Sequence, residues 1–160
     1  MHRVKRLANR LVIDLKPFSK KIEIAGSIRR KASNPRDIDI LIVPRDKNGI
    51  LQYFKSIDRK EKGKLLGAGG MALNAEVDGV GINIIFTSQP EWAPSLLHFT
   101  GPKGANIWKK RVAKDKGYIL NRHGLFDKKT KRRIPTPTEY SIYKHLDMTY
   151  RPPEMRGKKR

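Results

Sequence analysis

The sequence predicts an α+β fold: a mixed sheet with helices over residues 1–93, followed by a smaller C-terminal α/β lobe over residues 94–160. Three observations lead to it. Segments with helical and with alternating hydrophobic spacing interleave along the first half of the chain. The composition changes at the two prolines Pro90 and Pro94, after which the chain is more basic. A length of 160 residues, 38% of them hydrophobic, allows one domain or two small lobes.

The first lobe is predicted to contain helices and strands in alternation. Apolar residues at helical spacing predict a helix over residues 4–15, which Pro17 ends, and a short helix over 50–57. Alternating or continuous apolar runs predict strands at residues 21–26, 37–43, 71–77 and 80–86. The dipeptide Asp78-Gly79 between the last two indicates a two-residue hairpin, and Gly67, Gly69 and Gly70 predict a turn before them.

The second lobe is predicted to begin with the segment "LLHFTG" (96–101), followed by a helix over 103–116. On this helix we expect Trp108 and Val112 to face the core and the cations Lys109, Lys110, Arg111 and Lys114 to face solvent. A hairpin is expected around residues 121–123. Residues 136–139 have capping-box spacing, with Pro137 at the first helical position, and residues 156–160 read as a frayed basic tail.

Composition restricts the class of partner. The chain has 36 Lys and Arg against 15 acidic residues, a net charge of +21 that attracts polyanions. DNA or RNA is the first expectation, an anionic membrane the second, and a merely basic soluble protein the third. With no cysteine, disulfides and cysteine-based zinc sites are excluded, and four scattered histidines make a poor zinc site. No run is apolar enough for a membrane span and no secretory signal is present, so we expect an intracellular protein, in the cytoplasm or nucleoid. A viral origin is compatible with this expectation.

Asp37 and Asp39 form the first candidate site. Two carboxylates at positions i and i+2 of a strand point to the same side, about 7 Å apart at Cβ. They can bracket one divalent cation or two, and two ions about 4 Å apart can clamp both oxygens of an in-line phosphoryl transfer. Mg²⁺ favours a few carboxylates together with substrate phosphate oxygens.

The turn before this strand provides candidate phosphate ligands. Gly26 allows close backbone approach, Ser27 offers a hydroxyl, and Arg30 offers a guanidinium fork for triphosphate oxygens. An Asp-x-Asp pair alone is a weak signal, because such pairs often lie on solvated strand faces. Gly-Ser, an Arg three residues after the serine, and Asp-x-Asp ten after it form a far more specific set.

This ordered set resembles the signature of the polymerase beta-like nucleotidyltransferase superfamily. The segment "HFTG" (98–101) is similar to the Tyr-Phe-Thr-Gly nucleotide-binding turn of the family X DNA polymerases, and "TYRPPEMR" resembles that family's C-terminal end. The resemblance covers nearly the whole chain, in a minimal form without the helix-hairpin-helix domains of larger relatives. It implies a nucleotidyltransferase palm over residues 1–93 and a nucleotide- and template-binding lobe over 94–160.

The resemblance also implies roles for individual residues. Asp37 and Asp39 would bind two Mg²⁺ ions, for which Mn²⁺ can substitute. The nucleotide would be held by Gly26, Ser27, Arg30, Arg36, His98, Phe99, Thr100, Gly101 and Asn106. DNA would be contacted by Lys103, Lys110, Asn121, Arg122, Lys128 and Arg132. Arg36 stands where the family has a small residue of its phosphate loop, so it would supply charge in place of a backbone contact. Trp92 and Trp108 are expected to pack in the core.

One position departs from the family pattern. The family carries a third catalytic Asp sixteen residues before the Phe of its nucleotide-binding turn, and counting back from Phe99 gives Asn83. An amide is a weak neutral ligand and cannot be a carboxylate base. Asp78 is a poor substitute, since it belongs to the hairpin turn and has the wrong strand parity. We therefore expect Asn83, whether native or introduced, to leave binding intact and to impair catalysis.

The function expected from the sequence is a small, monomeric, Mg²⁺-dependent DNA polymerase of family X. It would use a dNTP to fill gaps in gapped or nicked duplex DNA during repair. Two alternatives remain open at this point. The first is a nucleotidyltransferase with another acceptor, such as an RNA end or a small molecule. The second is a non-catalytic DNA-binding relative, for which Asn83 is the best argument.

Overall fold

The computed structural model describes residues 2–60 and 63–158, with the side chains of residues 58–60 left out. The chain forms two compact units, Met1–Ile28 with Ala32–Thr87, and Arg29–Lys31 with Ser88–Arg160. The α+β class expected from the sequence is confirmed, because the first unit contains a mixed sheet with helices and the second a small sheet with helices. Among the described residues, no helix combines the length and apolar character needed to cross a bilayer.

A five-stranded sheet organises the first unit. Its order is β1-β2-β5-β4-β3, with β2 and β5 parallel and the other neighbours antiparallel. The strands are β1 (Ser19–Ile24), β2 (Ile38–Pro44), β3 (Gly63–Ala68), β4 (Ala72–Val77) and β5 (Val80–Phe86). Four of them lie where the sequence predicts strands. The edge strand β3 was not predicted, and Gly67, expected in a turn, lies within it.

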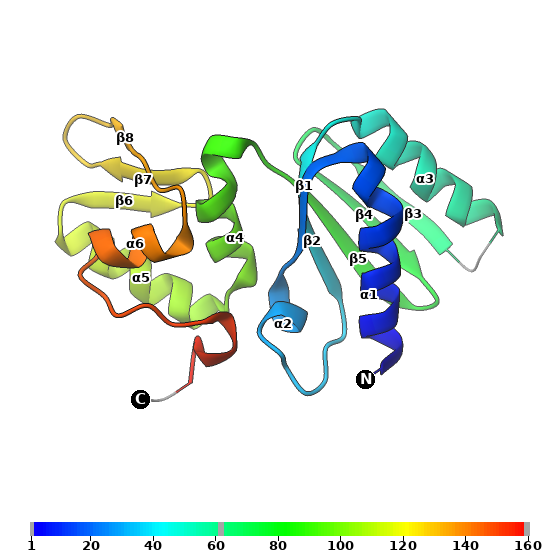
Figure 1. Cartoon of the computed structure of the whole chain (residues 1–160), viewed down its shortest axis with the longest axis horizontal. Helices are drawn as coiled ribbons and strands as arrows, with labels where there is room; N and C mark the ends of the chain where they lie inside the picture. The colour runs from blue at the N-terminus through cyan, green and yellow to red at the C-terminus, as the bar shows by residue number, and fades with distance from the viewer. Residues whose placement is uncertain (1, 61–62, 159–160) are drawn as a thin grey trace. The chain divides into compact units, whose positions relative to one another are not determined.

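Helices α1 (His2–Leu15) and α3 (Lys47–Lys60) pack on one face of this sheet (Figure 1). Their apolar stripes share a core with Ile38, Ile40 and Ile42 of β2, because every second residue of a strand points to the same face. The intervening residues of β2, β4 and β5 therefore point to the opposite face. This alternation places Asp39 on the face away from the two helices, as the sequence predicts.

The hairpin between β4 and β5 is confirmed. Val77 and Val80 are register partners, and Asp78 and Gly79 both have positive φ, 50° and 75°. Two successive positive φ values define the type I′ turn that suits twisted antiparallel strands. Asp78 is thus held in the turn, as expected.

The second unit combines three helices with a three-stranded antiparallel sheet of order β6-β7-β8. The helices are α4 (Trp92–Thr100), α5 (Lys103–Asp115) and α6 (Glu139–His145), and the strands are β6 (Tyr118–Asn121), β7 (Gly124–Asp127) and β8 (Arg133–Ile134). A 3-10 turn at Pro153–Met155 lies in the C-terminal segment of this unit. Between the units in sequence, the short helix α2 (Gly26–Arg29) follows β1, and only its last residue belongs to the second unit. The hydrophobic core of the second unit includes Leu97, Ala113, Leu125 and Ile142.

Three predictions for the second unit are wrong in detail. Trp108 does not face the core but is 56% exposed, whereas Lys109, expected in solvent, is only 3% exposed. The capping residue of α6 is Thr138, whose hydroxyl accepts from the backbone N of Ser141, so Pro137 lies before the helix rather than in it. Arg156, predicted in a frayed tail, is buried; residues 159 and 160 of that tail lie outside the described residues.

Candidate functional site

Asp37 and Asp39 lie at the start of β2. Asp37 is exposed and immediately precedes the strand, while Asp39 is half-buried within it. In the parallel pair β2–β5, Asp39 and Asn83 are direct register partners. On the far side of β5, Asn83 is in turn the partner of Asn74 on β4. A row of three polar residues therefore crosses the face of the sheet that the helices leave open.

Two glycines keep the space around these carboxylates open. Gly26 has a φ of +59°, and a Cβ atom there would lie 2.1 Å from Oδ2 of Asp39. A Cβ on Gly81 would lie 2.9 Å from Oδ1 of Asp37. The backbone N of Ala25 also donates to the carbonyl of Asp39, at 2.8 Å. Glycine is thus required at position 26 because the backbone there lies close to the side chain of Asp39. From the sequence alone, this glycine is explained by close approach to a phosphate.

The side chain of Asn83 contacts Asp39 directly. Its Nδ2 donates to Oδ1 of Asp39 at 2.9 Å. With no cation between them, an amide is favoured over a carboxylate here, since two adjacent carboxylates repel. For Asn83 to bind a cation jointly with Asp39, its amide must turn over and present Oδ1.

No third carboxylate completes the site among the described residues. Glu76 lies on β4 opposite Gly81, on the same face as Asn74 and Asn83. Yet the part of the chain that the structure describes holds no group of three His, Cys, Asp or Glu side chains able to bind a metal ion. The chemistry available is two carboxylates and an amide, which suits a divalent cation that completes its shell with substrate phosphate and water oxygens.

In the second unit, Arg30 and residues 98–101 come together at the end of α4. The Arg30 guanidinium donates to the carbonyl of Thr100. A Cβ atom on Gly101 would lie 3.3 Å from Nη1 of Arg30. The neighbouring Arg29 donates to Oγ1 of Thr100 at 2.8 Å, and Thr100 is fully buried. Gly101 has a φ of 64°, which glycine adopts without strain.

A small crevice, with space for about one water molecule, brings four other candidates together: His98, Asn106, Lys110 and Asn121. The amide of Asn106 donates to the carbonyl of His98 at 2.7 Å, and Oδ1 of Asn121 accepts from the backbone N of His123 at 2.8 Å. Burial, and then the nearby charges of Lys110, Arg122 and His123, lower the pKa of His98 below its usual value. These effects favour the neutral imidazole of His98.

The remaining candidates are spread over the surface. Phe99 stacks with the Arg122 guanidinium, 5.0 Å from the ring centre. Arg36, Lys103, Lys128 and Arg132 are exposed. The turn that carries Lys128 and Arg132 is ordered by Asp127, whose Oδ1 accepts from the backbone N of residues 129 and 130. Two of the cations are thus presented by a fixed turn rather than by a loose loop.

Sequence reasoning missed a buried ion triad. Glu139 accepts from Arg29 at 2.6 and 3.0 Å and from Arg156 at 2.6 Å. Burial alone would raise the pKa of Glu139, but the hydrogen bonds from Arg29 and Arg156 outweigh it, and the pKa is lowered. The sequence did contain a signal that Arg156 is ordered. Arg156 is the last residue of the segment "TYRPPEMR", which resembles the family's C-terminal end, and such a match implies an ordered segment rather than a frayed one.

Comparison with known proteins identifies similar polymerases. Residues 95–157 match the family model described as DNA polymerase beta thumb. The chain is 33% identical over 147 residues to the Repair DNA polymerase X of one isolate of African swine fever virus, covering 89% of this chain and 84% of that protein. For a second strain of the virus the identity is 31% over 163 residues, with 96% and 94% covered. The DNA polymerase/3'-5' exonuclease PolX of Bacillus subtilis is 26% identical over 159 residues, 94% of this chain and 27% of that protein.

Proposed function

The chain belongs to the family X DNA polymerases, and from this premise we propose that it fills short gaps in DNA during repair, with its catalytic step weakened by Asn83. The enzyme would add a dNMP to the 3′-hydroxyl of a primer and release pyrophosphate. The observation that carries the proposal is the hydrogen bond from Asn83 to Asp39. It puts a neutral amide beside the two carboxylates, on the strand where the family resemblance implies a third.

The donor set fits Mg²⁺, with Mn²⁺ as a substitute, since both prefer carboxylate, carbonyl and water oxygens. Asp37 and Asp39 would hold the metal, and Asn83 would add at most one neutral oxygen. Once the first ion is bound, less negative charge of the protein would remain to hold a second ion. When bound, the metal would neutralise charge on the triphosphate and promote ionisation of the 3′-hydroxyl.

The other residues would position the substrates. Ser27 and Arg30 would bind the β- and γ-phosphates, while Phe99, Thr100 and Gly101 would lie against the sugar of the dNTP. Asn106, oriented by its bond to the carbonyl of His98, would reach the base. Lys110 and Asn121 would contact the template strand, and Lys128 and Arg132 the DNA phosphates. Most of the rate enhancement would then come from positioning and charge neutralisation.

The decisive experiment is gap filling on a 5′-phosphorylated one-nucleotide gap, with the wild type and Asn83→Asp compared in Mg²⁺ and in Mn²⁺. General-base catalysis contributes about 10²–10⁴-fold, so Asn83→Asp should extend the primer at least about 100-fold faster. The matched control is Asn74→Asp, which introduces the same charge at the neighbouring register position on β4. It should change the rate by less than about three-fold.

Other results would point elsewhere. Equal rates for the wild type and Asn83→Asp would refute the impairment. Extension without a template strand would indicate a nucleotidyltransferase with another acceptor. No extension by Asn83→Asp, together with intact DNA binding, would favour a non-catalytic DNA-binding relative. Asp39→Asn should abolish whatever activity is present, since it removes a charge that no neighbour replaces.

A further inference from the structure

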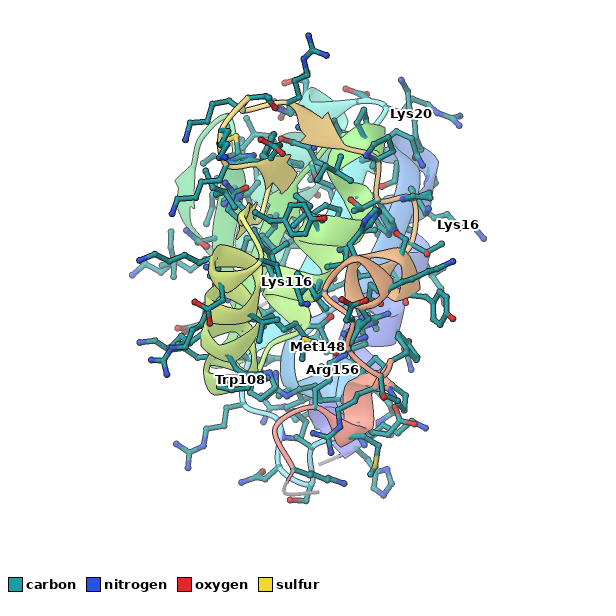
Figure 2. The ribbon with its side chains drawn as sticks, turned by 90° about the vertical axis from the view of Figure 1, so that its left-hand side faces the viewer. Lys16, Lys20, Trp108, Lys116, Met148 and Arg156 are labelled. Atoms are coloured by element: carbon teal, nitrogen blue, oxygen red, sulfur yellow. The ribbon has the colours of Figure 1, made fainter. Side chains whose placement is uncertain are left out.

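A hollow of about 620 Å³ opens in the second unit and is lined by residues of α5, α6 and the C-terminal segment. In Figure 2, Trp108, Met148 and Arg156 are seen gathered at this place, and all three line the hollow. Its volume lies within the range of about 300–1,000 Å³ typical of sites for small molecules. None of the residues proposed above to bind metal, dNTP or template lines it.

Trp108 forms an aromatic wall of the hollow. Its side chain is 56% exposed, and the preceding Ile107 is 51% exposed. The other tryptophan, Trp92, is 5% exposed and belongs to the interior. A large apolar ring left in solvent, with Arg111 one turn further along the same helix, is a combination of aromatic and basic groups that binds nucleic-acid bases.

Four basic residues also line the hollow, together with uncharged ones. Arg156 has a fully buried side chain whose Nη1 donates to Glu139, and its Nη2 has no hydrogen-bond partner among the residues that the structure describes. Lys109 is 3% exposed, and the hydrogen bond that its Nζ donates to the carbonyl of Ala105 is long, at 3.4 Å. Arg151 and Lys158 line the same space. Glu139, the carboxylate in contact with Arg156, already accepts from two guanidinium groups, so charge in the hollow is left to be balanced by an anion.

We propose that this hollow binds an unpaired nucleotide of a DNA strand, with the base stacked on the indole of Trp108 and a flanking phosphate held by Arg151 and Lys158. The proposal rests on the proposed function only for the identity of the polymer, DNA. Paired bases are already stacked within the duplex and cannot enter a hollow, so the ligand is single-stranded. The base would give the contact its strength, and the cations would orient the strand.

The test uses the intrinsic fluorescence of the whole protein, in which Trp108 is the exposed one of two tryptophans. An eight-residue oligo(dT) with a 5′-hydroxyl should quench the emission on titration. An oligonucleotide of the same length and charge with abasic sites throughout should bind more weakly and quench little. Equal affinity and equal quenching by both strands would mean that phosphate contacts alone are made, which overturns the stacking contact.

Two substitutions at one position separate stacking from packing. Trp108→Ala should weaken oligo(dT) binding about ten-fold and by at least about five-fold, the loss expected for one stacked base. Trp108→Phe keeps a π-face, so its affinity, measured by anisotropy of labelled DNA, should stay within about three-fold of the wild type. Tyr140→Ala is the matched control, because Tyr140 is a similarly exposed aromatic side chain of the same unit, 60% exposed, and does not line the hollow.

Unchanged affinity in Trp108→Ala would overturn the proposal. Gap filling by Asn83→Asp, measured separately, keeps the two proposals distinguishable. A protein that binds oligo(dT) through Trp108 but never extends a primer would retain this site and lose the proposed function. If instead the protein extends primers, and Trp108→Ala binds oligo(dT) as tightly as the wild type does, the proposed function would be retained and this site would be lost.

Discussion

Asp39 and Asn83 are register partners on two parallel strands, and their side chains form a hydrogen bond. A charge-assisted hydrogen bond of this kind contributes about 1.5–3 kcal/mol to stability. Replacing Asn83 by Asp removes the bond and introduces repulsion between carboxylates, unless a cation lies between them. The same change that should restore catalysis should therefore destabilise the protein in the absence of metal.

We expect Asn83→Asp to unfold at a temperature a few degrees lower than the wild type in EDTA, since about 1 kcal/mol shifts the midpoint by about 2–4 °C in a protein of this size. Adding Mg²⁺ should raise the midpoint of Asn83→Asp and recover most of the loss, and should move the wild type less. Differential scanning calorimetry with and without Mg²⁺ measures both shifts. A midpoint of Asn83→Asp that ignores Mg²⁺ would argue against a metal at this position.

Lys109 is a second residue at which burial and charge conflict. Burial, and then the charge of Arg156, lower its pKa from 10.5 to about 8. The unfolded chain therefore binds this proton more tightly than the folded protein does. Charged Lys109 reduces stability below pH 8, and the penalty is relieved as the pH rises from about 8 to 10.5.

Lys109→Met should accordingly be more stable than the wild type at pH 7, by about 1–3 kcal/mol, because each pKa unit corresponds to about 1.4 kcal/mol. The difference between the two should shrink as the pH approaches 10. Urea unfolding at several pH values measures it, with Lys110→Met, at an exposed position of the same helix, as the control. A difference that grows with pH would show that the buried ammonium is stabilised rather than strained.

At the scale of elements, Glu139 joins three segments far apart in sequence. It begins α6, Arg29 ends α2, and Arg156 lies in the C-terminal segment. Glu139→Gln keeps the shape of the side chain but removes the negative charge that Arg29 and Arg156 contact. Such losses cost about 3–5 kcal/mol.

We therefore expect Glu139→Gln to lower the free energy of unfolding by about 3–5 kcal/mol at pH 7. Because the pKa of Glu139 is lowered in the fold, its contribution is present above the usual carboxyl pKa and is lost as the pH falls through the lowered value. The gap between the wild type and Glu139→Gln should thus close in acid. Chemical denaturation at pH 7 and pH 3 tests this, and a gap of equal size at both would contradict the role of the charge.

Helix α5 and strand β3 show where sequence patterns stop being informative. Hydrophobic spacing located α5 correctly but assigned Trp108 to the core and Lys109 to solvent, because spacing ranks residues by polarity and cannot anticipate a buried lysine over the ring of Tyr143. The edge strand β3 carries two glycines in six residues and a mostly exposed surface, so it lacks the alternation that marks a strand. Motifs with fixed spacing agree better with the structure: Asp39 and Asn83, singled out by spacing, are register partners on β2 and β5. The segment 98–101, expected to form a turn, instead forms the end of α4 and the residue after it.

At the scale of the whole molecule, the net charge of +21 makes binding to DNA an ion-exchange reaction. Each phosphate neutralised by Lys or Arg releases condensed counterions, so the logarithm of the affinity falls with the logarithm of salt at about 0.9 per phosphate contact. A protein that holds DNA through surface charge should show a steep slope and little dependence on sequence. Figure 2 shows many basic side chains reaching outward, among them Lys16 and Lys20.

We expect the slope for a gapped duplex to be about −5 or steeper between 50 and 200 mM salt, with affinities for unrelated sequences within about three-fold. Lys128→Gln combined with Arg132→Gln removes two proposed phosphate contacts from the ordered turn and should make the slope less steep by about two. Lys16→Gln combined with Lys20→Gln makes the same change in net charge at exposed positions outside the proposed interface, and should leave the slope nearly unchanged. Fluorescence anisotropy across the salt series measures all three. If both pairs shift the slope equally, the whole surface charge holds the DNA, and the turn at residues 128–132 has no special part in it.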